Sequence, residues 1–199
     1  MTSLSERPAP QCRRIAALAC HPAAPCPAAL VLEGWAQLLD RQRLAVGFTL
    51  RGDLDRLNVP GPGAPRRTDR LWEHTCFEAF LAMPGHDAYW ELNLSPSTEW
   101  AAYGFQRCRE GGFAASIPEP RITVHRSPGQ LDLGAVAALD ALDGLDTGLG
   151  LQVGLAAVLE SREGPLSFWA IRHAQDRPDF HHRTGFVLEL PPGQPGARP

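Results

Sequence analysis

Glycine and proline are the residues that most restrict what this sequence can fold into. The chain of 199 residues contains 19 of each. Both destabilise the interior of a helix, glycine through its backbone entropy and proline through its missing N–H group. A helical bundle is therefore excluded, and we expect many short elements that are joined by turns.

The segments between the turn residues have the composition of short strands. They alternate between apolar and polar residues or are continuously apolar. Segment 131–142 is helix-like but could equally be a strand followed by a turn, and 52–69 is a long loop rich in Pro, Gly and Arg. The sequence predicts an all-β fold, an antiparallel sandwich or barrel with at most one short helix. The predicted strands are 28–35, 43–51, 74–83, 89–95, 100–105, 121–126, 148–160, 166–173 and 184–190.

Composition along the chain predicts a single domain between two tails. Residues 1–10 are polar and contain prolines, and residues 191–199 read PPGQPGARP. Between them, no low-complexity linker or internal repeat divides the sequence. We therefore expect an N-terminal tail over 1–10, one domain over 11–190 and a disordered C-terminal tail over 191–199.

The charged residues exclude several classes of function. All 19 basic residues are arginine, so catalysis by a lysine amine and a P-loop lysine are ruled out. The formal net charge of −3 argues against a general nucleic-acid surface, which needs a basic excess.

The apolar runs and the cysteines predict a location. No apolar stretch approaches the roughly 20 residues that span a bilayer. The run before Cys20 is shorter than the roughly 7–15 residues of a signal peptide. Five cysteines without a CxxC motif indicate reduced thiols. We expect a cytoplasmic protein that does not bind membranes.

Two predicted strands, 74–83 and 89–95, combine one apolar face with one polar face. The short connection 84–87 predicts that they form an antiparallel hairpin, so their like faces coincide. Carboxylates and amides bind pairs of hydroxyl groups, and an aromatic ring stacks on a sugar, so the polar face suits a polyhydroxylated ligand. It could equally be a solvated or hydrogen-bonded outer face. Its residues are His74, Glu78, Tyr89, Glu91 and Asn93.

The same region resembles a known family. The stretches RLWEHTCFEAFL (70–81), YWELNLSP (89–96) and WAAY (100–103) resemble the DOMON-like superfamily, close to family 9 carbohydrate-binding modules. Segments 124–128, 167–173 and 178–182 are similar to a bacterial stand-alone subgroup, and the likeness runs from about residue 13 to residue 190.

This resemblance implies a β-sandwich of jelly-roll or immunoglobulin-like type that binds sugar or haem. Family 9 modules hold glycan ends between tryptophan rings, which makes Trp72 and Trp100 candidate stacking rings, although strand parity also permits either to be core. Some of these modules carry calcium, but no carboxylate cluster here matches such a site. The resemblance brings no catalytic residues.

A second group of polar residues follows the predicted strand 166–173. His173, Asp179, His181 and His182 could bind zinc, contribute to a binding face, or cap and hydrogen-bond a loop. We include Arg172 and His173 among the candidate ligand-binding residues, although an acidic partner for Arg172 is the alternative. A haem would need an axial ligand such as Met83, which lies at the turn end of its strand, so we predict no cofactor and no metal.

Three arginines, Arg66, Arg67 and Arg70, cluster in the long loop. They could receive an anionic sugar, because guanidinium groups fit carboxylate and phosphate, or form local salt bridges with Asp69 and Glu73.

The sequence thus predicts a non-catalytic binding module for a carbohydrate or a similar polar small molecule. One alternative is an enzyme acting on a glycan with Glu78 and Glu91, whose spacing on paired strands suits a glycosidase. Another is a protein-interaction sandwich without a small ligand. The candidate ligand-binding residues are Trp72, Glu78, Tyr89, Glu91, Asn93, Trp100, Arg172 and His173.

Overall fold

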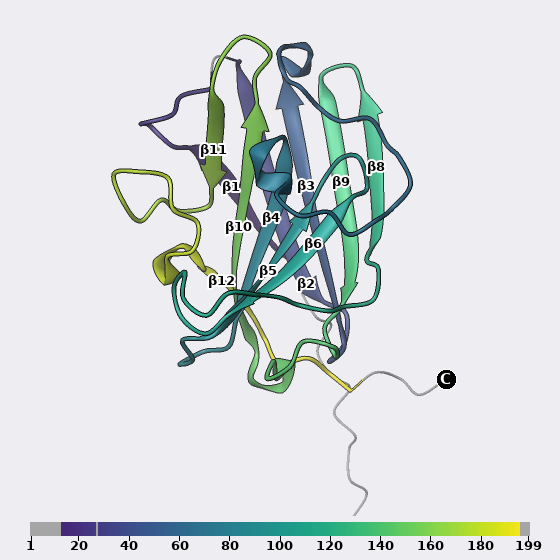
Figure 1. The fold of residues 1–199 in the computed structure, drawn as a ribbon, viewed down its shortest axis with the longest axis vertical. Helices are drawn as coiled ribbons and strands as arrows, with labels where there is room; N and C mark the ends of the chain where they lie inside the picture. The colour runs from purple at the N-terminus through teal and green to yellow at the C-terminus, as the bar shows by residue number, and fades with distance from the viewer. Residues whose placement is uncertain (1–12, 27, 196–199) are drawn as a thin grey trace, which may run out of the picture.

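The protein is a β-sandwich of two antiparallel sheets packed face to face (Figure 1). The computed structural model describes residues 13–26 and 28–195. Within them, every pair of neighbouring strands is antiparallel. The predicted all-β antiparallel sandwich is therefore confirmed.

One strand joins the two sheets. The first part of β1 (Arg14–Cys20) pairs with β2 (Leu30–Leu38), whereas Ala19 and Cys20 pair with β11 (Leu166–Ala170). The sheet that we call the β3 sheet contains, in spatial order, β8 (Arg121–Ser127), β9 (Gln130–Ala138), β3 (Arg43–Gly52), β2 (Leu30–Leu38) and β1 (Arg14–Cys20). The β4 sheet contains β11 (Leu166–Ala170), β10 (Leu151–Glu160), β4 (Cys76–Ala82), β5 (Tyr89–Leu94), β6 (Trp100–Phe105) and β7 (Phe113–Ala114), with β12 (Leu188–Leu190) also on β10.

The main core lies between the two sheets. Alternate residues of each strand point inward, as the two-residue period of a strand requires. Phe48 of the β3 sheet meets Phe77 of the β4 sheet with ring centroids 5.0 Å apart. A second, smaller cluster on the outer face of the β4 sheet includes Phe80, Tyr89 and Phe186. Strands β4 and β5 are thus buried on both faces, which positions polar side chains under a covering loop.

The structure decides one alternative that the sequence leaves open and adds elements that the sequence does not predict. The segment 131–142 is strand β9 followed by a turn, and no α-helix forms among the described residues. The helical pieces are instead the short 3-10 turns η1 (Leu54–Arg56), η2 (Leu71–Glu73), η3 (Thr147–Leu149) and η4 (Arg183–Gly185). Strand β1 was not expected from the sequence, because it forms through pairing with residues that are distant along the chain. None of the described helices is long and apolar enough to cross a membrane.

The expected C-terminal tail is partly fixed to the sandwich. Gly193 donates its N–H to the Thr147 carbonyl, and the N–H of Arg41 donates to the Gln194 carbonyl. The start of segment 191–199 therefore lies against the sandwich, while 196–199 and 1–10 lie outside the described residues, and the division into one domain and two tails stays a prediction.

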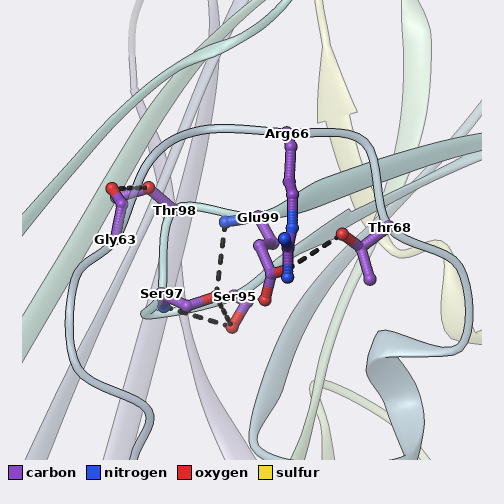
Figure 2. A network of polar contacts seen from close by, with 7 residues as sticks. All are labelled: Gly63, Arg66, Thr68, Ser95, Ser97, Thr98 and Glu99. Carbon is purple, nitrogen blue, oxygen red and sulfur yellow. Dashed lines mark hydrogen bonds and ion pairs between the residues drawn. The ribbon is translucent and has the colours of Figure 1, made fainter.

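The long loop before β4 is held by a network centred on Glu99 (Figure 2). The Glu99 carboxylate accepts hydrogen bonds from Arg66 Nε (2.7 Å), Thr68 Oγ1 (3.0 Å) and Ser97 Oγ (2.8 Å). The predicted local salt bridges are also confirmed, since Arg67 pairs with Asp69 and Arg70 with Glu73. This loop leads directly into η2, which carries Trp72, and the Trp72 ring packs edge-on against Tyr103 with centroids 5.7 Å apart.

Candidate binding site

The floor of the candidate site is the hairpin of β4 and β5. Glu78 lies opposite Asn93, and Phe80 lies opposite Glu91. The predicted hairpin is confirmed, and its apolar face forms part of the main core. This register makes Glu78 and Glu91 diagonal neighbours on the outer face, a separation of roughly 7–8 Å between the residues.

Small residues beside Glu78 create a depression in the sheet. The row that crosses five strands here has alanine at three of its five positions, whereas larger residues such as Phe168 and Tyr103 stand in the rows on either side. Small side chains in one row of a sheet leave a hollow between the larger side chains of the neighbouring rows. In order, the row is Ala170, Ala156, Glu78, Asn93 and Ala101.

A pocket of about 410 Å³ occupies this depression. Such a volume lies within the range of small-molecule sites. Its apolar walls come from η2, β6, β10, β11 and the loop after β11, and consist of Trp72, Tyr103, Phe105, Val158, Phe168, Pro178 and Phe180. Its polar groups are Glu78, Glu91, Arg109 and His181.

Glu78 is the least satisfied polar group of this pocket. The residue is only 3% exposed, and its carboxyl group makes no hydrogen bond or ion pair with any described residue. Burial, reinforced by repulsion from Glu91, raises the pKa of this carboxyl well above its ordinary value. A buried polar group without a partner destabilises a fold, so Glu78 is kept at a cost that a ligand could offset.

Glu91 differs because it has a protein partner. Asn93 Nδ2 donates a hydrogen bond of 2.7 Å to Glu91 Oε1. Burial raises the pKa of Glu91 to about 7, although this bond and the charge of Arg109 oppose the shift. The other oxygen, Oε2, lies 3.9 Å from His181 Nε2.

The hydrogen bonds around Tyr89 fix the state of His181. The Arg109 backbone N–H donates to the Tyr89 hydroxyl at 3.2 Å, which leaves that hydroxyl free to donate to His181 Nδ1 at 2.8 Å. We therefore assign the proton of the neutral ring to Nε2, which faces Glu91. Burial, and secondarily Arg109, lower the pKa of His181 to about 4, so the ring is uncharged at neutral pH.

Arg109 connects two loops over the edge of the pocket. Its guanidinium pairs with Asp179 Oδ1 at 2.9 Å, and the same oxygen accepts from the His181 backbone N–H. Arg109 has a φ of 58°, in the left-handed region that non-glycine residues rarely adopt. Such conformations persist where surrounding contacts fix them, and here the fixed contact is the bond to Tyr89.

The structure brings only some of the candidate residues together. Trp72, Glu78 and Glu91 line the pocket. Tyr89 and Asn93 are completely buried behind it and support His181 and Glu91.

Three candidates lie elsewhere. Trp100 pairs with Leu94 on the inward face and belongs to the main core, so the core alternative for this ring is the correct one. Arg172 donates to the Thr184 carbonyl rather than to an acidic residue. His173 bonds to the Ala19 carbonyl and contacts the ring of His21.

The described residues do not bring three metal-binding side chains together. Within the expected histidine group, Asp179 pairs with Arg109, His181 bonds to Tyr89, and His182 bonds to Thr184. Each of these three side chains thus bonds to another part of the protein, and His181 also lines the pocket.

Several residues that line the pocket are not among the ligand-binding candidates predicted from the sequence. Tyr103 and Phe105 point to the same face as Ala101, and Phe168 points to the same face as Ala170. Strand alternation therefore predicts that these rings lie on the outer face, provided that the strand pairs are known. Arg109 and Phe180 lie in loops without such periodicity.

Comparisons with known proteins agree with the fold. No protein-family model matches this sequence, and no curated protein matches it. A crystal structure from Bacteroides uniformis, described as a "putative carbohydrate-binding protein", matches with a TM-score of 0.62 and 15% identity over 87% of this chain and 84% of that chain. This likeness supports the β-sandwich, and the DOMON-like resemblance stays a prediction.

Two further structures are more distant. Both are of a family 9 carbohydrate-binding module from Caldicellulosiruptor kristjanssonii. The complex with glucose matches with a TM-score of 0.45 and 11% identity, over 77% of this chain and 73% of that chain. The complex with cellotriose matches with a TM-score of 0.40 and 12% identity, over 69% and 65%. At these scores the likeness carries no argument about the site.

Proposed function

We propose that this protein is a carbohydrate-binding module that holds one or two sugar units in the pocket above Glu78 without cleaving them. The observation that carries the proposal is the Glu78 carboxyl group, which is buried and unpartnered within the described residues at the base of an aromatic pocket. The description of the Bacteroides uniformis structure points to the same class of ligand.

The two kinds of lining suit the two kinds of sugar surface. Sugar hydroxyl groups can donate to and accept from carboxyl groups, the imidazole N–H and the guanidinium. The C–H face of a sugar ring packs on aromatic rings, and Trp72, which is 38% exposed, presents such a ring at the pocket wall.

A glycan-binding screen followed by calorimetry tests this proposal. Trp72→Ala should weaken the dissociation constant of a bound glycan by about tenfold, because stacking contributes about 1 kcal/mol beyond the buried area. The matched control is Trp35→Ala, since Trp35 lies across Gly47 on the opposite outer face of the sandwich. The proposal is wrong if no glycan binds, or if both variants weaken binding equally.

A glycan-cleaving enzyme is the second candidate, because two carboxyl groups lie diagonally in one pocket. Its distinguishing result in the same experiment would be product formation from the bound glycan that disappears in Glu78→Gln.

A further inference from the structure

The charges that line the pocket do not balance. Two carboxyl groups, Glu78 and Glu91, face the space from neighbouring strands. Among the described lining residues, Arg109 is the only cation, and it is already paired with Asp179 at 2.9 Å. His181 turns an imidazole N–H toward Glu91 without a full charge. The pocket therefore has more potential negative charge than the protein neutralises.

The groups that face the two carboxyls come from every adjoining element. Asn93 on β5 and His181 on the loop after β11 approach Glu91, and Arg109 on the loop after β6 acts on both carboxyls. Cys76 on β4 lies on the same face as Glu78, fully buried. None of these groups makes a hydrogen bond or ion pair with the Glu78 carboxyl.

Aromatic rings surround the same space. Trp72, Tyr103, Phe105, Phe168 and Phe180 all line it. The faces of aromatic rings attract cations, and a set of rings around one site with a carboxylate is the chemistry that holds ammonium groups. An ammonium group has three N–H donors and no acceptor, so it complements a site whose free groups are carboxylate oxygens.

We propose that the sugar bound here is an amino sugar, whose protonated amine lies against Glu78 and Glu91 within the ring of aromatic side chains. This inference rests on the proposed function and names the substrate class of that site. A cation between two carboxylates also relieves their mutual repulsion, which a neutral hydroxyl group cannot do. N-acetylation removes the charge, so an N-acetylated sugar lacks the feature that is recognised.

Calorimetric titration of the full chain with D-glucosamine, D-glucose and N-acetyl-D-glucosamine at about pH 7 tests the inference. We expect glucosamine to bind at least about tenfold more tightly than the two neutral sugars. Its binding should also release protons to the buffer, because a carboxyl whose pKa is raised by burial gives up its proton more readily when it pairs with an ammonium group, and both pocket carboxyls have raised pKa values. Titrations in two buffers of different ionisation enthalpy measure this release, which should be absent with glucose.

The variant Glu78→Gln keeps the shape of the side chain and removes its charge. It should weaken glucosamine binding by about tenfold and reduce proton release, with Glu91 still contributing, and it should weaken glucose binding less than glucosamine binding, because glucose carries no charge. Glu163→Gln, which removes an exposed carboxylate paired with Arg56, is the control and should leave all three affinities unchanged.

The outcomes separate the two proposals. If glucose or N-acetylglucosamine binds as tightly as glucosamine, and no proton is released, the amino-sugar inference is wrong and the carbohydrate-binding proposal stands. If none of these sugars and no glycan of the screen binds, both are wrong. The wild-type titrations decide this even if Glu78→Gln does not fold.

Discussion

Two carboxyl sites on the β4 sheet differ in how the protein treats charge. Glu99 lies immediately before β6, next to the long loop, and receives bonds from Arg66, Thr68 and Ser97. Glu78 receives none from the described residues, although it is buried more deeply. The bonds from Ser97, Arg66 and Thr68 hold the pKa of Glu99 below its usual value, while burial raises that of Glu78. The first site is satisfied by the protein itself, and the second is the one that we propose receives the ligand.

The comparison predicts opposite dependences of stability on pH, and the pocket should give the larger effect. A carboxyl whose pKa is raised on folding binds more protons in the folded than in the unfolded state, so the free energy of unfolding falls as pH rises between the two pKa values. For Glu91, whose pKa rises from 4.5 to about 7, the loss is about 3 kcal/mol between roughly pH 5 and pH 8.

Urea denaturation across this pH range measures the loss. Glu91→Gln keeps an acceptor for Asn93 and should flatten the curve, whereas Glu163→Gln should leave it unchanged. Because the lowered pKa of His181 makes stability rise with pH up to about pH 6.5, the test is the difference in free energy of unfolding between wild type and Glu91→Gln, and a difference that stays constant from pH 5 to pH 8 would contradict the raised pKa of Glu91.

The contribution of the Glu99 network to the free energy of unfolding should depend on pH in the acidic range. Glu99→Ala leaves the hydroxyl groups of Thr68 and Ser97 without their acceptor and should lower the free energy of unfolding by about 2 kcal/mol at neutral pH. Because the pKa of Glu99 is lowered on folding, its contribution is present above the unfolded value and is lost as pH falls through the folded one.

The measurement is denaturation of wild type and Glu99→Ala near pH 7 and near pH 3. The difference between them should shrink in acid, and Glu163→Ala should show little difference at either pH. An equal difference at both values would mean that the carboxylate charge is not what the network stabilises.

The sequence could predict the floor of the pocket because strand alternation is local. The alternation in 74–83 and 89–95, with a short connection, places Glu78 and Glu91 on one face without knowledge of the rest of the fold. The orientation of Trp100 could not be predicted from its own strand alone, because its inward direction depends on pairing with Leu94.

The rest of the pocket depends on contacts between distant segments. The loop after β11 folds back over the sheet because Phe180 and Phe186 pack against Phe80, about a hundred residues earlier in the chain. Strand β1 forms by pairing with β2 and β11, and its own sequence has little of the alternation that marks a strand. Local sequence patterns cannot predict these contacts, because they are stabilised by the burial of apolar surface between segments that are far apart along the chain.

The smallest expected effect on stability comes from replacing either of two exposed arginines, Arg66 and Arg109. Each pairs with a carboxylate at the surface, and replacing either by glutamine should change the free energy of unfolding by less than about 1 kcal/mol. The Tyr89–His181 bond should survive in Arg109→Gln, because Tyr89 receives the backbone N–H of Arg109 rather than its side chain. The guanidinium, however, lowers the pKa of both pocket carboxyls.

Removal of the Arg109 guanidinium should therefore raise the pKa values of the pocket carboxyls and move the pH range over which stability falls to higher pH. Arg66→Gln should leave that range unchanged, because its guanidinium acts on Glu99. Denaturation of both variants over the same pH series measures this, and an equal movement in both would show that net charge, rather than the position of Arg109 beside the pocket, sets the titration. If only Arg109→Gln moves it, the pocket carboxyls respond to a charge at the pocket edge, and a ligand cation bound there should lower their pKa values as the Arg109 guanidinium does.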